Sequence, residues 1–204
     1  MSDKPLKVGR VDADRYPESL FVDARRVLSD FPPPDAEAAA TRDRMLRLLD
    51  DGPRVLSRLG GPDHFTASAL VVEPAGQRVL LCLHGRMHRW VQMGGHLEPE
   101  DETLAGAALR EAVEESGISD LWLVPEPIGL DIHSVNCKSG PSRHFDVRFA
   151  AVAPPGAREQ VSDESADLGW FPYDDLPSPL AHATAPLVPA ALEALRRTPS
   201  RPAP

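Results

Sequence analysis

The chain has few of the residues that mark a secreted or membrane protein. Its 204 residues include two cysteines, Cys82 in the apolar run RVLLCLH and Cys137 in a polar stretch, and neither lies in a metal-binding spacing. No run approaches the ~18 apolar residues of a membrane helix, and the opening MSDKPLKVGRVDADRY lacks the apolar segment of a secretory signal. We therefore expect reduced thiols, no membrane contact and a cytoplasmic location.

An excess of basic residues is also missing. Lys and Arg number 22 against 31 Asp and Glu, which gives a formal net charge of −9. This charge argues against nonspecific binding to nucleic acid or to an anionic membrane, because both require a basic surface. A phosphorylated small molecule is not excluded, since a bound metal ion can reverse the local field. The apolar fraction of 42% is sufficient for a sizeable core.

The stretch 94–118, GGHLEPEDETLAGAALREAVEESGI, predicts a loop that leads into a helix. Gly94 and Gly95 let the backbone approach a ligand closely, and residues 103–116 contain no Pro and are rich in Ala, Leu and Glu. Gly117 is a natural end for this helix. At about 100° per residue, one small and apolar face packs inward, formed by Ala105, Ala108, Leu109, Ala112 and Ser116.

A neighbouring face of the same helix is acidic. Glu111, Glu114 and Glu115 lie within about a quarter turn of one another, so they repel unless a cation neutralises them. Carboxylate oxygens suit Mg²⁺ or Mn²⁺. Arg110, one turn before Glu114, can pair with a carboxylate. The alternative is a solvated helix face, but such a face usually intersperses Lys with Glu, and this one has a single Arg.

The spacing of these residues resembles the signature of the Nudix hydrolases. Seven residues separate Glu102 from the run REAVEESGI, which starts at Arg110 and ends at Ile118. Members of that family cleave diphosphate linkages in nucleotide derivatives with the help of divalent cations. One departure is visible, because the family pattern has five residues between the loop glycine and the first glutamate, whereas six separate Gly95 from Glu102. The extra residue lies in the turn 98–101 and affects the loop geometry more than the metal cluster.

The resemblance implies a role for each of these residues. Glu111 and Glu115 would bind the principal Mg²⁺, for which Mn²⁺ could substitute, with the Gly95 carbonyl as a further ligand. Glu114 would bind a second cation or help to deprotonate the attacking water. The residues that would orient the carboxylates are Arg110 and Glu102.

The expected activity is hydrolysis of a diphosphate linkage in a nucleoside diphosphate derivative, a small-molecule substrate. Two alternatives remain open: a pyrophosphohydrolase that removes damaged nucleoside triphosphates, and a non-catalytic Nudix-like regulator that senses a nucleotide. The intact arginine and glutamates weigh against the regulator, because loss of the metal ligands would be its simplest signature.

The remaining pattern agrees with the fold that the resemblance implies, an α/β/α sandwich with a mixed sheet. Residues 64–73 and 77–84 predict a hairpin around Pro74-Ala75-Gly76. Further strands and a last helix are predicted at 122–124, 128–135, 144–152, 169–171 and 186–197. We expect the Nudix-like domain to cover 63–198 and the tail 199–204 to be disordered.

Residues 1–62 predict a helical arm packed on this domain. Two helical patterns, 16–29 and 35–50, are split by Pro32-Pro33-Pro34, and Asp35 is a plausible N-cap for the second. The second helix has an apolar stripe that includes Met45 and Leu49. Packing is the simpler interpretation, and a homodimer contact or a substrate lid are the alternatives.

A polar face is predicted on the strands 128–135 and 144–152. If residues 136–141 connect an antiparallel hairpin, His133 lies across from His144 and Asp131 across from Asp146. Two His and two Asp can bind phosphate or a further metal ion, so we predict that this face lines the substrate pocket beside the glutamates. An ordinary solvent-facing strand face is the alternative.

Two further features have weaker signals. His84, His88 and His96 lie near the glycine loop, but no partner cysteine or HxxxH pair lies on one helix, so solvated or hydrogen-bonding histidines are favoured over a zinc site. Glu164 precedes the strand around Trp170, and in some Nudix enzymes an acidic residue from such a loop joins the metal site or acts as a base. Glu164 is therefore a further candidate.

Overall fold

The structure of the chain is a computed structural model that describes residues 16–137, 140–161 and 165–197. The first part of the predicted arm, the tail 199–204 and the candidate Glu164 lie outside the described residues. None of the helices among the described residues is long and apolar enough to cross a membrane.

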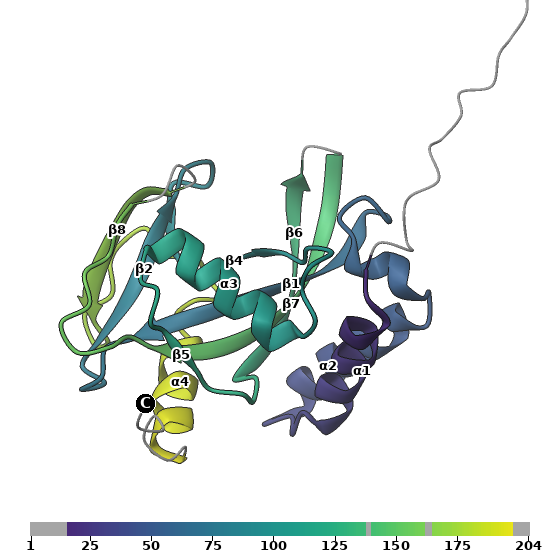
Figure 1. Cartoon of the computed structure of the whole chain (residues 1–204), viewed down its shortest axis with the longest axis horizontal. Coiled ribbons are helices and arrows are strands. Elements are labelled where there is room, and N and C mark those ends of the chain that lie inside the picture. The colour runs from purple at the N-terminus through teal and green to yellow at the C-terminus, as the bar shows by residue number, and fades with distance from the viewer. Residues whose placement is uncertain (1–15, 138–139, 162–164, 198–204) are drawn as a thin grey trace, which may run out of the picture.

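A mixed sheet of eight strands forms the centre of the fold (Figure 1). Its main path runs β3-β2-β1-β7-β5, while β4 pairs with β1, β6 with β7 and β8 with β2. The strands are β1 (Asp63–Val72), β2 (Arg78–His84), β3 (Arg89–Val91), β4 (Met93–His96), β5 (Trp122–Leu123), β6 (Gly129–Cys137), β7 (Gly140–Val152) and β8 (Ser165–Pro172).

Strand β1 is the axis of this sheet. It forms the predicted hairpin with β2 at its end, where Val72 lies opposite Val79, and it runs parallel to β7 along its whole length. At its centre, Thr66 lies opposite His96 and Ala69 opposite Met93, so β4 occupies the edge that β2 leaves free. The glycine loop is therefore part of the sheet itself.

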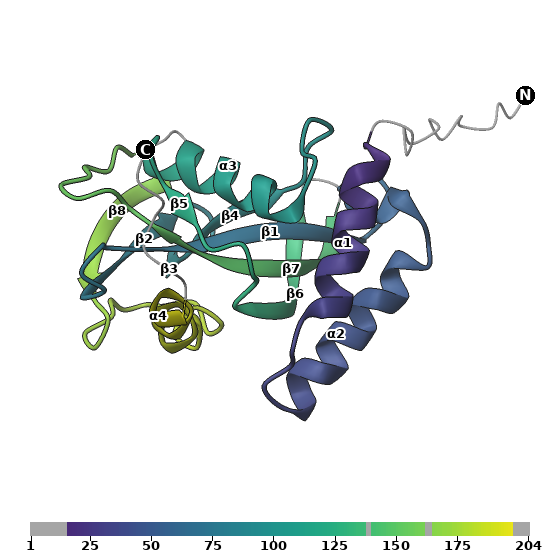
Figure 2. The same cartoon turned by 60° about the horizontal axis from the view of Figure 1, so that its bottom comes forward.

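Helices cover the two faces of the sheet. Figure 2 shows α3 (Leu104–Ser116) on one face and α4 (Leu187–Arg197) on the other. Side chains of β1 point alternately to the two faces of the sheet. Ala67 and Val71 pack in the core under α3, whereas Leu70 and Val72 pack with α4. This arrangement confirms the predicted α/β/α sandwich.

The N-terminal helices α1 (Glu18–Asp30) and α2 (Ala36–Leu49) lie at one end of the sheet, followed by a short 3₁₀ turn at Pro53–Leu56 (Figure 2). Asp35 caps α2 as predicted, since its Oδ1 accepts from the Ala38 amide at 2.8 Å. Asp23 of α1 is buried, and its Oδ2 accepts from the Leu104 amide at 2.8 Å. Helix α1 thus satisfies a free amide at the start of α3.

The hairpin of β6 and β7 has the predicted register but a shorter connection. His133 lies opposite His144 and Asp131 opposite Asp146. The expected connection 136–141 is wrong, because the pairing continues until Cys137 lies opposite Gly140. Cys137 is therefore the last residue of a strand and not part of a polar loop, which changes what its thiol can contact.

Candidate functional site

Local interactions fix both ends of helix α3. The Thr103 hydroxyl accepts from the Gly106 amide at 2.9 Å, and Gly117 ends the helix with a left-handed φ of 70°. Its inward face is made of small residues, with Ala108 and Ala112 fully buried. The small side chains bring the helix close to the sheet, so that the next face, which contains the glutamates, meets strand β4.

Arg110 connects the acidic side chains of this site. Its NH1 donates to Glu111 Oε1 at 3.0 Å and to Glu114 Oε2 at 3.2 Å, while its NH2 donates to the His96 carbonyl at 3.1 Å. Nε and NH2 also donate to the two carboxylate oxygens of Asp101 at 3.0 and 2.9 Å. The hydrogen bond to Asp101 raises the pKa of Arg110, so the guanidinium stays charged.

The carboxylate that holds Arg110 is Asp101 and not Glu102. Asp101 is 7% exposed, whereas Glu102 is exposed and makes no hydrogen bond or ion pair within the described ranges. Asp101 follows Gly95 after five residues, the family spacing when it is counted from the glycine. The expectation for Glu102 was counted back from Arg110. Counted forward from Gly95, the extra residue falls between Asp101 and the helix start at Leu104, and Glu102 is exposed.

Two glycines let the glutamates reach the backbone of β4. Glu115 Oε2 accepts from the Gly94 amide at 3.2 Å. A Cβ on Gly95 would lie 2.7 Å from both carboxylate oxygens of Glu111, so any side chain there would fill the space that the carboxylate occupies. Carboxylates beside a main-chain carbonyl form an all-oxygen donor set. These residues fit Mg²⁺ or Mn²⁺, the cations that the resemblance implied.

The predicted polar strip lies on the face of the sheet opposite α3. Asp146 is 4% exposed and accepts from Thr66 Oγ1 at 3.0 Å, from Ser68 Oγ at 2.8 Å and from Arg148 Nε at 2.9 Å. Arg148 NH2 also donates to Asp131 Oδ2 at 2.7 Å. The acceptor oxygens of Asp146 are thus occupied by protein groups, and this geometry favours a positioning role over direct contact with substrate.

The described histidines of this face belong to two groups. His133 is half-exposed, and its Nδ1 lies 2.6 Å from Asp131 Oδ2. His144 instead lies with His64, His96 and Cys137, and the ligand atoms of these four residues are all within 4.8 Å of one another. We call these four residues the histidine–cysteine set and the residues Glu111, Glu114 and Glu115 the glutamate set.

The histidines of the histidine–cysteine set are neutral at physiological pH. Burial, together with the neighbouring imidazoles, lowers the pKa of His96 to about 4 and that of His144 to about 3. Burial also lowers the pKa of His64, although backbone groups of Gly61 and Pro62 oppose this shift. Neutral imidazoles each have a free lone pair, which a metal ion requires.

The sequence alone did not identify this set. His96 was grouped with His84 and His88 by proximity in the chain, whereas its neighbours come from β1, β6 and β7. The parallel register places His64 directly opposite His144, and that pairing joins residues 80 positions apart. The available signal was the strand alternation that placed His133 and His144 on one face, but the pairing of β1 with β7 was needed to add His64 to that face.

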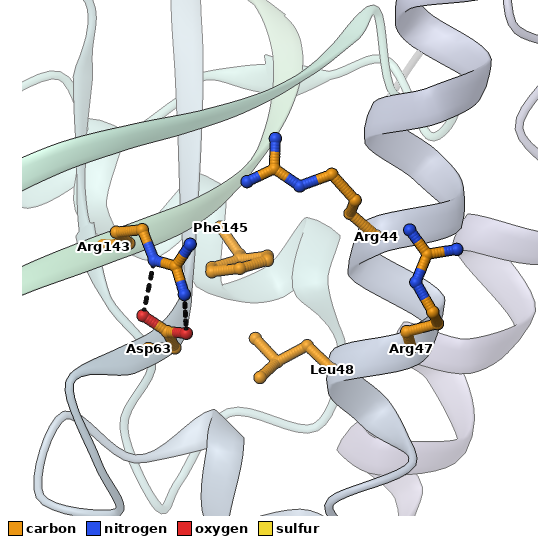
Figure 3. Close-up of a pocket in the computed structure, with 6 residues that line it drawn as sticks. All are labelled: Arg44, Arg47, Leu48, Asp63, Arg143 and Phe145. Carbon is orange, nitrogen blue, oxygen red and sulfur yellow. Dashed lines mark hydrogen bonds and ion pairs between the residues drawn. The ribbon is translucent and has the colours of Figure 1, made fainter.

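A separate hollow of about 230 Å³ lies between α2 and the first residues of β1 and β7 (Figure 3). The Arg143 Nε donates to Asp63 Oδ1 at 2.8 Å there, while Arg44 and Arg47 extend from α2 toward the hollow. Leu48 and Phe145 supply its apolar wall. No residue of the glutamate set lines this hollow, so it is not part of the site on α3.

Comparisons with known proteins agree with this geometry. The NUDIX domain profile matches residues 62–191. A Mycobacterium tuberculosis protein named mutator protein MutT4 is 28% identical over 154 residues, which cover 71% of this chain and 54% of that protein. The chain thus spans about half the length of this curated relative.

Solved structures show the same fold at low identity. An Ap4A hydrolase of Caenorhabditis elegans, in a binary complex, has a TM-score of 0.51 at 22% identity and covers 65% of this chain and 97% of its own. A MutT protein from Methanosarcina mazei has a TM-score of 0.51 at 16% identity, with 66% of this chain and 95% of that chain covered. At these identities the likeness concerns the fold.

Proposed function

Because the chain belongs to the NUDIX domain family of hydrolases, we propose that it is a Mg²⁺-dependent pyrophosphohydrolase that cleaves a diphosphate linkage in a nucleoside diphosphate derivative. The supporting observation is the Arg110 network, in which one guanidinium holds Glu111 and Glu114 beside the β4 backbone. The cytoplasmic location remains a prediction from the sequence.

Glu111, Glu115 and the Gly95 carbonyl would hold the principal cation. Glu111 is buried against Gly95, and Glu115 is fixed by the Gly94 amide, so both carboxylates are oriented before a ligand arrives. When bound, the cation lowers the pKa of a coordinated water and offsets the negative charge that develops on the diphosphate.

Glu114 is the candidate proton acceptor of this site. Its side chain is 57% exposed, in contrast to the 11% of Glu111, so water can reach it. Arg110 restrains Glu114 from one side, and the buried Asp101 anchors Arg110 in turn. A carboxylate that is exposed yet held in one orientation can accept a proton from an attacking water or bind a second cation.

The residues predicted to bind substrate have unequal geometries. His133 is half-exposed and oriented by Asp131, but it lies on the face of the sheet opposite the glutamate set, so its contact with substrate stays a prediction from the sequence. Asp146 is buried and paired with Arg148, so we propose that it positions the strip and does not meet the substrate. His144 faces His96 and Cys137, and Glu164 stays a prediction from the sequence.

A triphosphate substrate is the second candidate. Removal of damaged nucleoside triphosphates is the alternative that the sequence left open, and the relative that is 28% identical over 154 residues is named a mutator protein. A non-catalytic regulator is disfavoured, because Glu111 and Glu114 keep their arginine partner, and Glu111 and Glu115 keep their approach to the glycines. Nucleic acid and membranes are not expected partners at a net charge of −9.

The proposal is tested by a substrate screen with Mg²⁺. Nucleoside diphosphate sugars, dinucleoside polyphosphates and nucleoside triphosphates would be compared by the phosphate released after coupling to a phosphatase. We expect turnover of at least one diphosphate class, with loss of turnover in Glu114→Gln. A screen in which the wild type and Glu114→Gln are equally inactive on all three classes, although both bind nucleotide, would favour the regulator.

A further inference from the structure

We infer that His64, His96, Cys137 and His144 form a second metal site, specific for Zn²⁺ or a similar borderline divalent cation. This site lies on the opposite face of the sheet from the glutamate set. It goes beyond the proposed hydrolase activity and does not depend on it. The four residues come from four strands, β1, β4, β6 and β7, so an ion held by them would join all four.

The spacing of the ligand atoms is close to that of a tetrahedral zinc site. With bonds of about 2.0–2.3 Å, two ligand atoms of such a site lie about 3.3–3.8 Å apart. Cys137 Sγ is 3.4 Å from His144 Nε2 and 4.0 Å from His96 Nε2, and all four ligand atoms are within 4.8 Å. Side-chain shifts of about 1 Å are therefore sufficient to complete the site, since the strands already fix the backbones.

His64 supplies an independent observation. Its side chain is 0% exposed, and within the described ranges neither Nδ1 nor Nε2 makes a hydrogen bond, although the backbone of Gly61 and Pro62 lies near the ring. A buried polar group without a partner loses its hydrogen bonds to water and gains none in return, so an imidazole in this position requires compensation. The ring of His64 stacks on His96 at 5.2 Å and meets His144 at 4.9 Å, which places it within the set. A metal bond to one ring nitrogen would provide that compensation.

The donor chemistry selects the kind of metal. Three imidazoles and one thiol form a nitrogen and sulfur set, which suits Zn²⁺ and related cations and does not suit Mg²⁺. The glutamate set has the opposite preference, since its donors are oxygens. Two sites in one chain can therefore hold different ions without competing.

The consequence of this site would be structural. His96 directly follows Gly95, and its carbonyl accepts from Arg110 NH2 at 3.1 Å. An ion bound to the His96 ring would fix β4 against β1 and the β6–β7 hairpin, and with β4 it would fix the backbone that faces Glu111. The metal would thereby support the geometry of the glutamate set from the other face of the sheet.

The experiment is metal binding to the full chain with Zn²⁺ and Co²⁺ as probes, in the presence of millimolar Mg²⁺. We expect one tightly bound Zn²⁺ per chain, a raised melting temperature, and a Co²⁺ complex with tetrahedral visible bands and a thiolate-to-cobalt charge-transfer band. Cys137→Ser should remove the charge-transfer band and weaken Zn²⁺ binding by about 100-fold or more. His64→Asn should weaken binding to a similar extent.

Three control variants separate this site from other ligands. Cys82→Ser removes the other thiol, His182→Ala removes an exposed histidine, and Glu111→Gln alters the glutamate set, so all three should keep the Co²⁺ spectrum. The inference is overturned if Cys137→Ser binds Co²⁺ with the wild-type spectrum and affinity, or if the wild type binds no Zn²⁺ beyond what millimolar Mg²⁺ displaces. Neither result depends on finding a substrate.

Discussion

The glutamate set and the histidine–cysteine set lie on opposite faces of one short strand, and they are built in different ways. The glutamates come from consecutive turns of a single helix, and Arg110 holds two of them at 3.0 and 3.2 Å. The histidine–cysteine set is assembled from four strands and buries His64 completely. The first set keeps an exposed carboxylate and oxygen donors, whereas the second has three imidazoles and one thiol, of which His64 is buried and the other three residues are half-buried.

This difference explains why the glutamate set suits catalysis and the histidine–cysteine set suits a structural role. A site for a diphosphate must admit substrate and water, and Glu114 is open to both, with 57% of its side chain exposed. A site that ties strands together benefits from burial, because water does not compete for the ligands. The residue pair Gly95 and His96 connects the sets, since the first faces Glu111 and the second faces His144.

The largest effect should follow from the exposed member of the glutamate set. We expect Glu114→Gln to lower kcat by about 10² or more with the fold intact, because one charge leaves a site whose electrostatic contribution is several kcal/mol. Steady-state kinetics on the identified substrate would measure this effect, with Zn²⁺ content as the matched readout of the other set. Near wild-type turnover would remove Glu114 from its proposed role.

Gly95→Ala should be the next most severe change. The backbone of Gly95 is not left-handed, so the methyl group acts only through its position, 2.7 Å from both Glu111 oxygens. We expect the Mg²⁺ concentration for half-maximal activity to rise by about tenfold, roughly 1.4 kcal/mol in cation binding. Gly106→Ala, on the exposed side of α3, is the matched control and should leave the Mg²⁺ requirement unchanged.

Asp101 and Glu102 provide a matched pair that tests which carboxylate holds Arg110. Asp101→Asn should reduce the free energy of unfolding by about 1–3 kcal/mol and also lower kcat, because Arg110 loses a charged double hydrogen bond. Glu102→Gln should stay within about 0.5 kcal/mol of wild type, since the side chain is exposed. Thermal unfolding of both variants would measure the two changes in stability. Equal losses of stability would contradict the assignment of Asp101 as the partner of Arg110.

The histidine–cysteine set should make the metal-free protein sensitive to mild acid. His96 and His144 have folded-state pKa values of about 4 and about 3, below the ~6.5 of an unfolded histidine. The unfolded chain therefore binds more protons below pH ~6.5, and stability falls by up to about 1.4 kcal/mol per pH unit for each group as the pH drops toward 4.

Chemical denaturation in the presence of a chelator would measure this slope between pH 7 and 4. His144→Asn should flatten it, and His182→Ala, which changes an exposed histidine, should not. An identical slope in all three proteins would show that other groups cause the acid sensitivity.

The sequence predicted the parts of the molecule that depend on neighbours in the chain. The helix with its end at Gly117, the β1–β2 hairpin, the Asp35 cap and the opposition of His133 and His144 are all local or near-local features, and the structure confirms each of them. The spacing in the sequence also allowed Asp101 as the partner of Arg110. Counting from Gly95 selects Asp101 and counting from Arg110 selects Glu102, and the sequence alone does not show which count applies.

The parts that sequence reasoning missed depend on pairing between distant strands. The parallel alignment of β1 with β7 brings His64 to His144, and the extension of β6 to Cys137 brings the thiol 3.4 Å from that histidine. Neither contact follows from periodicity, because alternation assigns a residue to a face but does not identify the strand beside it.

The most direct test of two separate metal sites is a crystal of the wild-type chain soaked with Mn²⁺ and Zn²⁺ and measured at the absorption edge of each metal. The account predicts a manganese peak among Glu111, Glu115 and the Gly95 carbonyl, and a zinc peak among His64, His96, Cys137 and His144. A single shared position for both metals, or a zinc peak only at the glutamates, would contradict it.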